Sequence, residues 1–210
     1  RTNHIWRTSP LRRIGPGAMT TSAQEPHVGL VVEGRGDLIS IPILVRKHLH
    51  SKGDYRDLLH KPVPLHGRDK AIVPGGIEGY VATTASRPGC MGVIVILDSE
   101  GDDPVALATE LNSRVAAAEV TKHPVFVLII DQSFEDWIFA SAETLDLNLT
   151  WDASRRGQAA IKEALRPKSY TKPVWQPRLT NRVDINLIAQ RCPSFVDFTR
   201  YIDTIADCIK

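Results

Sequence analysis

The sequence predicts an α/β fold in which helices flank a mostly parallel sheet. The first observation is a set of three continuous apolar runs, at residues 27–33 (HVGLVVE), 91–97 (MGVIVIL) and 125–130 (VFVLII). Strands that are buried on both faces of a sheet read as such uninterrupted runs. The second observation is that each run leads into a segment whose apolar residues have helical spacing, and this alternation is typical of a parallel sheet.

The first run is followed by a turn and a helix. Gly34 and Gly36 permit a tight turn after the strand, and Asp37 is expected to cap the helix that follows. Apolar residues then recur at three- and four-residue intervals over residues 38–50. Pro42 falls near the first turn, where its missing N–H is tolerated.

The middle of the chain alternates polar segments with helical patterns. Residues 51–76 are rich in proline and glycine, so we expect a loop there with one short strand at residues 62–65. Helices are predicted over residues 77–86, over residues 104–119, which begin with a proline suited to a first helical position, and over residues 134–144.

Beyond residue 145 the sequence contains no strong strand pattern. We expect short helices at residues 158–165, 185–190 and 194–208, and a proline-containing loop at residues 169–180.

The chain therefore divides into an extension at residues 1–26, an α/β core at residues 27–145 and a helical appendix at residues 146–210. The appendix is expected to pack on the core, because about 60 residues make a marginal core alone.

The net charge of +2 comes from residues 1–18, which hold four arginines and no acid, whereas the rest of the chain carries 22 basic and 24 acidic residues. We expect the extension to be disordered or added in cloning, with Met19 as the native start. A transit peptide and a phosphate-binding arm are the alternatives.

Composition excludes a membrane protein and a disulfide scaffold. The longest apolar run is residues 125–130, far below the ~20 residues that span a bilayer. Cys90, Cys192 and Cys208 form no CxxC pair and no cluster with zinc spacing, so we expect incidental thiols in a reducing cytoplasm.

Acidic residues follow each of the three predicted buried strands. Glu33 follows the first, Asp98 and Glu100 follow the second, and Asp131 with Glu135 follows the third. Because the carboxyl ends of parallel strands form one edge of the sheet, these acids should converge there, and a buried cluster of carboxylates requires a cation. Oxygen-only ligation favours Mg²⁺ or Mn²⁺. Taken singly, each acid has an alternative role as a solvated residue or as a partner of a helix dipole.

Other catalytic motifs are missing from the sequence. It contains no GxxxxGK[ST] phosphate loop, no GxSxG nucleophile elbow and no HExxH zinc motif. An Asp-x-Asp pair directly after the first strand, which haloacid-dehalogenase-type phosphatases carry, is also missing.

The chain carries the acidic motif EGRGD directly after the first predicted strand and LDSEGDD after the second. These two motifs resemble those of the TOPRIM fold, which is shared by topoisomerases, primases and OLD-type nucleases. Over residues 27–210 the chain resembles a TOPRIM-like family called domain of unknown function 4276. The motifs that carry this resemblance are residues 32–49 (VEGRGDLISIPILVRKHL), 95–104 (VILDSEGDDP), 134–141 (FEDWIFAS), 169–176 (SYTKPVWQ) and 191–195 (RCPSF).

The resemblance implies metal-dependent phosphodiester chemistry. Glu33 matches the TOPRIM glutamate that serves as general acid/base or metal ligand, and Asp98 and Glu100 match the acidic pair that holds Mg²⁺. Many TOPRIM proteins have Asp at the second position of that pair, so Asp102 is a substitute for Glu100. Glu135, on the family's Glu-x-Trp helix, is implied to complete the site.

Cleavage of nucleic acid also needs positive charge for the phosphate backbone. We expect Lys172 to be catalytic, and the residues expected to contact nucleic acid are Arg35, Arg68, Lys70, Tyr170 and Arg191. Arg35 has an alternative role as a salt-bridge partner of Glu33. Phe134 and Trp137 are expected in the core rather than as platforms for base stacking.

The leading hypothesis is a Mg²⁺- or Mn²⁺-dependent nuclease that acts on DNA or RNA. The resemblance also implies an ATPase partner, because relatives of this type occur beside ATPases in bacterial anti-phage systems. Two alternatives are a non-catalytic interaction module of an ATPase complex and a phosphatase or nucleotide hydrolase with a small substrate.

Overall fold

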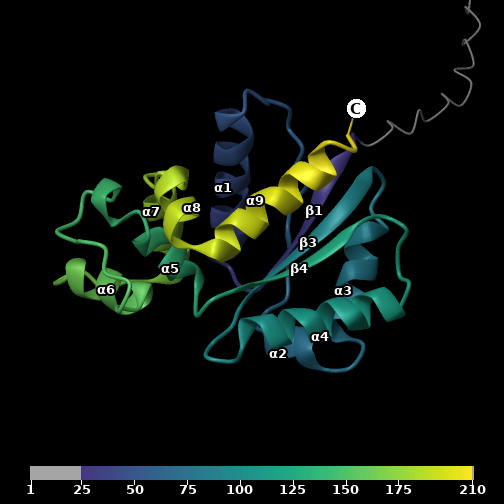
Figure 1. Ribbon diagram of the computed structural model, residues 1–210, viewed down its shortest axis with the longest axis horizontal. Coiled ribbons are helices and arrows are strands. Elements are labelled where there is room, and N and C mark those ends of the chain that lie inside the picture. Colours follow the sequence, from purple (N-terminus) through teal and green to yellow (C-terminus); the bar gives the residue numbers. More distant parts are fainter. Residues whose placement is uncertain (1–24, 210) are drawn as a thin grey trace, which may run out of the picture.

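The computed structural model describes residues 25–209, so the predictions for residues 1–24, including Met19 as the start, lie outside the described part. The chain forms one sheet of four parallel strands in the order β2-β1-β3-β4 (Figure 1). The strands are β1 (His27–Val32), β2 (Val63–Pro64), β3 (Cys90–Asp98) and β4 (Val125–Ile130). The predicted α/β class is confirmed, and the sheet is entirely parallel.

The helices are α1 (Asp37–Ser51), α2 (Asp69–Ile72), α3 (Gly76–Ala85), α4 (Pro104–Ala117), α5 (Phe134–Phe139), α6 (Gly157–Ala164), α7 (Lys172–Thr180), α8 (Ile185–Arg191) and α9 (Pro193–Ala206), with a 3-10 turn at Ala142–Thr144. Within residues 25–209, no helix has both the length and the apolar character needed to cross a membrane.

Alternate residues of the strands build two cores, one on each face of the sheet. In β3, Ile94 and Ile96 join a cluster with apolar residues of α1 and α9. Val93 and Val95, which point the opposite way, join a second cluster with residues of α3 and α4. The continuous apolar pattern of β3 therefore follows from its burial on both sides.

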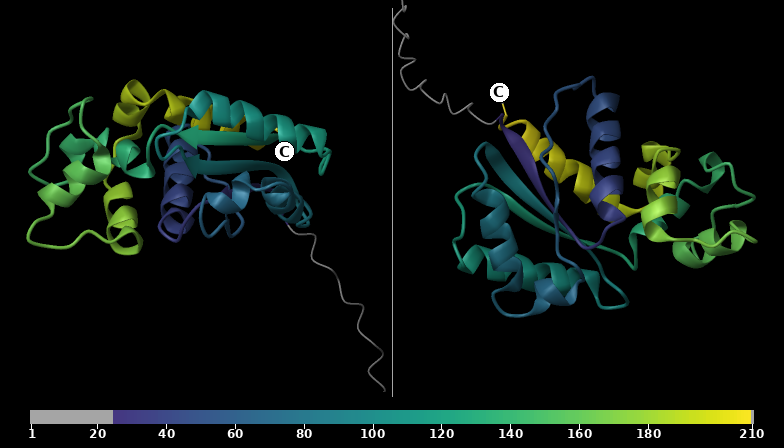
Figure 2. Two further views of the ribbon diagram at one scale, coloured as in Figure 1. Left: turned by 90° about the horizontal axis from the view of Figure 1, so that it is seen from below. Right: turned by 180° about the vertical axis from the view of Figure 1, so that it is seen from behind.

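The short helices α5 to α8 gather at one end of the molecule, beyond the carboxyl ends of the strands (Figures 1 and 2). From this group α9 returns across β1, β3 and β4. Its residues Phe195, Phe198 and Ile202 are buried in the same core as α1. The C-terminal helical segment thus covers one face of the sheet.

Three predicted elements differ from the structure. The segment expected to be loop at residues 51–76 contains the short helix α2 in addition to β2. The loop expected at residues 169–180 is wrong from Lys172 onward, where α7 begins. Pro173 lies in the first turn of that helix, where no N–H is needed, and Pro177 forgoes one hydrogen bond further along. The helix expected over residues 134–144 ends at Phe139 and gives way to the 3-10 turn. For α7, contacts with α1 and α5 outweigh the local effect of the two prolines.

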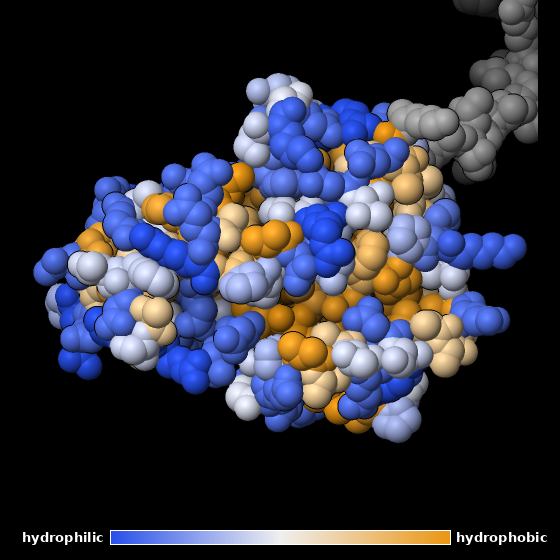
Figure 3. All heavy atoms as spheres, in the orientation of Figure 1, coloured by the Kyte–Doolittle hydropathy of each residue, from blue (hydrophilic) through white to orange (hydrophobic). Residues whose placement is uncertain are grey.

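Strand β4 is an edge strand whose outer backbone is partly covered by a side chain. Asn112 of α4 donates from Nδ2 to the Val127 carbonyl at 3.1 Å, and its Oδ1 accepts the Val127 N–H at 3.1 Å. The amide thus pairs with the strand as a neighbouring backbone would. The surface between α4 and α9, where β4 lies, shows exposed apolar residues (Figure 3).

Candidate functional site

The candidate site lies where the chain leaves β1 and β3. These neighbouring strands are followed by helices on opposite faces, α1 on one and α4 on the other, so their carboxyl ends mark a topological switch point. Glu33 follows β1 directly and Asp98 is the last residue of β3. Glu33 Oε2 accepts the Asp98 backbone N–H at 3.2 Å. The parallel register thus brings these two acids together as predicted.

A third acid, Asp37, comes from the start of α1. Its Oδ2 accepts the Gly34 N–H at 2.9 Å, and its Oδ1 accepts a hydrogen bond from Gln176 Nε2 of α7 at 2.7 Å. Gln176 is fully buried and packs so closely on the turn that a Cβ atom on Gly36 would lie 1.6 Å from its Oε1. Glycine at position 36 therefore allows α7 to reach Asp37.

The fourth acid, Glu135, is fully buried in the first turn of α5. Tyr170 donates its hydroxyl hydrogen to Glu135 Oε1 at 2.7 Å, whereas Glu135 Oε2 has no hydrogen-bond partner among the described residues. The neighbouring Phe134 N–H donates to Asp98 Oδ1 at 2.9 Å. Helix α5 therefore carries one acid, Glu135, and orients another, Asp98, through the Phe134 backbone N–H.

Lys172 supplies a positive charge to this group. Its Nζ lies 3.6 Å from Asp98 Oδ2 and 3.6 Å from Glu135 Oε2. We define the carboxylate cluster as Glu33, Asp37, Asp98 and Glu135. One ammonium thus faces four carboxylates, so the cluster carries an excess of negative charge when all four are ionised.

Burial changes the proton affinities in the cluster. Desolvation raises the pKa of Asp98 well above its usual range, and it also raises the pKa of Glu33 and of Asp37, each with smaller contributions from neighbouring carboxylates. Burial and the adjacent Glu135 raise the pKa of the Tyr170 hydroxyl, so Tyr170 is a hydrogen-bond donor at neutral pH. Burial alone would lower the pKa of Lys172, but attraction to Glu135 and Asp98 outweighs it and the pKa is raised.

These shifts predict how stability depends on pH in the metal-free protein. Asp98 binds its proton more tightly when folded, so its stabilising contribution is complete below its ordinary pKa of 3.8 and is lost as the pH rises through the folded-state value. The wild type should therefore gain melting temperature relative to Asp98→Asn as the pH is lowered from 8 to about 4. Thermal unfolding of both proteins in EDTA measures this difference. A difference that shrinks as the pH falls would contradict the assigned burial of Asp98.

Two of the predicted metal ligands pair with an arginine beside the cluster. Arg68 contacts Asp102, and its Nη1 lies 3.5 Å from Glu100 Oε2. The Arg68 side chain is only 10% exposed, whereas those of Glu100 and Asp102 are 59% and 64% exposed. The structure thus joins these three residues to one another, although the charge of Glu100 still contributes to the raised pKa of Glu33.

The remaining residues predicted to bind nucleic acid lie in different settings. Arg35 and Lys70 are exposed, and neither has an ion-pair partner within 4.0 Å in the described part of the chain. Tyr170 belongs to the cluster through Glu135. Arg191 holds Glu143 with two hydrogen bonds of 2.8 and 2.9 Å, donates to the Ala140 carbonyl and stacks 4.5 Å from the Trp151 ring centroid. Its contacts therefore support the end of α5.

Asp37 and Gln176 were not among the site residues predicted from the sequence. Asp37 was expected to cap the helix, yet Gly36 precedes the helix as its cap residue and the Asp37 carboxylate bonds back to the turn and across to α7. Both residues stand within the family motifs, EGRGD and SYTKPVWQ, and that was the available signal.

The donor chemistry of the cluster fits a divalent cation. Across residues 25–209, no group of three or more His, Cys, Asp and Glu side chains is arranged to hold a metal ion. The cluster nevertheless offers only oxygen donors, and Glu135 Oε2 is a buried carboxylate oxygen without a hydrogen bond. Such a group is costly unless a cation compensates it, and oxygen donors suit Mg²⁺ or Mn²⁺. Asp98 and Glu135, which already face the Lys172 ammonium, are the first candidates to hold one.

A groove of the described structure lies away from the cluster. It has a volume of about 940 Å³ and runs along β4 between α4 and α9, with Val105, Ile129, Trp151 and Tyr201 among its lining residues. No member of the carboxylate cluster lines it. We place the candidate site at the cluster because two buried acids, Asp98 and Glu135, lie there beside one lysine.

Comparison with known proteins identifies a family. Curated proteins and solved structures provide no match to the chain. A family model described as "Domain of unknown function (DUF4276)" matches residues 32–203, which include all four members of the carboxylate cluster and Lys172. The chain therefore belongs to the DUF4276 family.

Proposed function

We propose that the protein is a Mg²⁺- or Mn²⁺-dependent nuclease that hydrolyses phosphodiester bonds of DNA or RNA. One observation carries this proposal: at the topological switch point of a parallel sheet, a single lysine pairs with two of four clustered carboxylates, and a fully buried oxygen of Glu135 has no hydrogen-bond partner among the described residues. The resemblance of the Glu33 and Asp98 motifs to the TOPRIM fold supports the same chemistry.

Each group then has a role that its contacts support. The cation supplies charge stabilisation for the phosphate and activation of a water molecule. Glu33 uses Oε2 to accept the Asp98 N–H, and burial raises its pKa above the ordinary value of a glutamate, which is the direction that favours a general base. Tyr170 and the Phe134 N–H fix the orientation of Glu135 and Asp98. Lys172 offers an ammonium to the phosphate.

Nucleic acid would be recruited by a few local charges. Arg35 adjoins Glu33 on the exposed turn after β1, and Lys70 is exposed on α2. Outside residues 1–18 the chain has two more acidic than basic residues, so no general positive field is available. We therefore propose that the cation and these side chains together hold the backbone phosphates.

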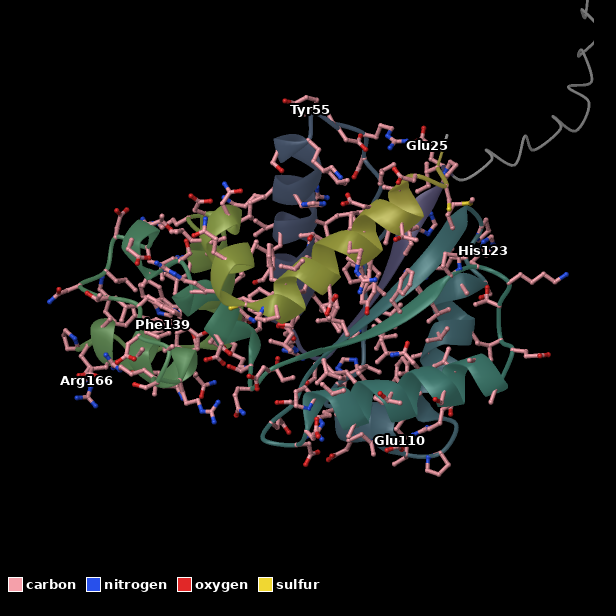
Figure 4. All side chains as sticks on the ribbon, viewed as in Figure 1. Glu25, Tyr55, Glu110, His123, Phe139 and Arg166 are labelled. Atoms are coloured by element: carbon pink, nitrogen blue, oxygen red, sulfur yellow. The ribbon has the colours of Figure 1, made fainter. Side chains whose placement is uncertain are left out.

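The test is cleavage of labelled single- and double-stranded DNA and RNA with Mg²⁺, Mn²⁺ or EDTA. Glu33→Gln keeps the size of the side chain and removes its charge, and it should lower the cleavage rate by about 10²-fold or more. Glu110→Gln is the matched control, because Glu110 extends into solvent from α4 with 61% of its side chain exposed (Figure 4). The control should cleave as the wild type does.

Several results would contradict the proposal. Equal cleavage by the wild type and Glu33→Gln would reject the assigned centre. Cleavage of small phosphoesters but not of polynucleotides would replace the nuclease with a phosphatase or nucleotide hydrolase. A folded wild-type protein that binds neither Mg²⁺ nor Mn²⁺ and co-purifies with an ATPase would favour the interaction module. We also propose an ATPase partner, which rests on the family resemblance, and co-purification from the native host tests it. A cytoplasmic location is a further proposal, and it rests on the free thiols.

A further inference from the structure

Lys172 lies between two acids of the carboxylate cluster. Its Nζ is equidistant from Asp98 Oδ2 and Glu135 Oε2, at 3.6 Å from each. Charge-assisted hydrogen bonds between ammonium and carboxylate groups are ordinarily about 2.7–2.9 Å long. Lys172 therefore compensates the charge of both acids without bonding closely to either, and Glu135 Oε2 is left without a hydrogen bond.

The helix that carries Lys172 does not favour a positive charge at this point. Lys172 is the first residue of α7, and the amino terminus of a helix carries partial positive charge that disfavours a lysine. The ammonium is instead retained by the opposite charges of Asp98 and Glu135, whose carboxylate oxygens each lie 3.6 Å from Nζ. The lysine is thus held by the cluster and not by its own helix.

The Lys172 side chain is partly exposed, so its ammonium can move from the cluster into solvent. It is 42% exposed although its Nζ reaches a fully buried glutamate. A lysine stem has four rotatable carbons, so the ammonium can swing to solvent without any movement of α7. Asp37 remains in place when it does so, because Gln176 and the Gly34 N–H hold that carboxylate independently.

We propose that Lys172 is an internal counter-ion that a divalent cation displaces from Asp98 and Glu135, which releases the ammonium to meet the substrate phosphate. This inference rests on the proposed metal-dependent function and adds a regulatory step to it. In the metal-free protein Lys172 compensates part of the charge of Asp98 and Glu135. Binding of the cation and release of the lysine towards the substrate are then one event.

The first test is titration calorimetry of the full chain with Mn²⁺. Lys172→Met removes the competing charge, so it should bind Mn²⁺ about 10-fold or more tightly than the wild type does. Lys168→Met is the matched control, because Lys168 is exposed four residues earlier and its Nζ lies over the Trp175 ring at 5.8 Å, outside the cluster. The control affinity should equal that of the wild type, and Asp98→Asn should lose the binding heat.

The second test follows displacement in the wild type and needs no variant. Reductive methylation of lysines, read out by peptide mass spectrometry, should become faster at Lys172 when Mn²⁺ is added, while the rate at Lys168 stays constant. This measurement decides the question if Lys172→Met does not fold.

The outcomes separate this inference from the proposed function. If the wild type binds Mn²⁺ but Lys172→Met binds no more tightly, or if methylation of Lys172 does not rise with Mn²⁺, the lysine is not displaced and the counter-ion role is wrong, while the metal-dependent function stands. If the folded wild type and Lys172→Met both fail to bind Mn²⁺, the proposed function itself fails.

Discussion

Gly157→Ala is expected to lower the free energy of unfolding by about 3 kcal/mol, because the added methyl group would collide with backbone atoms. A Cβ atom at position 157 would lie 2.4 Å from the Glu135 carbonyl oxygen and 2.8 Å from the Asp136 Cα. Backbone atoms cannot rotate away as side chains can, so α5 and α6 would have to separate. The Gly157 N–H also donates to Asp136 Oδ1 at 2.7 Å, and that hydrogen bond would be strained.

Urea unfolding of Gly157→Ala beside Gly79→Ala measures this effect. Gly79 lies inside α3, and a Cβ atom there would meet nothing within 4 Å. Alanine at position 79 should therefore stabilise the helix by about 0.5–1 kcal/mol. If alanine is tolerated equally at both positions, α6 does not pack on Glu135 as described. Because Glu135 sits at this contact, the same variant should weaken Mn²⁺ binding.

Trp137→Ala should cost about 3–5 kcal/mol of stability. The Trp137 ring is 1% exposed and packs edge-on against Phe195 at a centroid distance of 5.1 Å. Its Nε1–H donates to Ser194 Oγ at 2.9 Å, so the truncation creates a cavity and also breaks a hydrogen bond between α5 and α9. Thermal or urea unfolding gives the difference directly.

The matched control for this truncation is Tyr55→Ala. Tyr55 is 74% exposed at the outer end of the molecule, past the end of α1 (Figure 4), and its loss should change stability by no more than about 0.5 kcal/mol. A similar cost for the two truncations would mean that α5 is not anchored to the core through Trp137. In that event the placement of Glu135 would also be in doubt.

The fold was predictable wherever burial alone determines the local pattern. Strands β1, β3 and β4 are buried on both faces, so their apolar runs identify them, and the rule for parallel sheets brings Glu33 and Asp98 together. Glu135 was predicted near the same edge for the same reason.

The parts that sequence reasoning did not predict depend on contacts between distant segments. Gln176 meets Asp37 across 139 residues of chain, and no local pattern encodes that approach. The pairing of Arg68 with Glu100 and Asp102 is likewise set by how the segment after β2 folds beside the loop after β3. Helix α7 was missed because its two prolines argue locally against a helix, whereas packing on α1 and α5 favours it.

The acids of the carboxylate cluster are synthesised earlier in translation than their partners on α7. A nascent polypeptide carries Glu33, Asp98 and Glu135 well before the ribosome adds Lys172 and Gln176. Until α7 emerges, Asp37 lacks its amide partner and the buried acids lack their ammonium. A chain that stalls or is truncated before residue 172 therefore has no complete centre, so the chemistry of the site begins only when translation has passed α7.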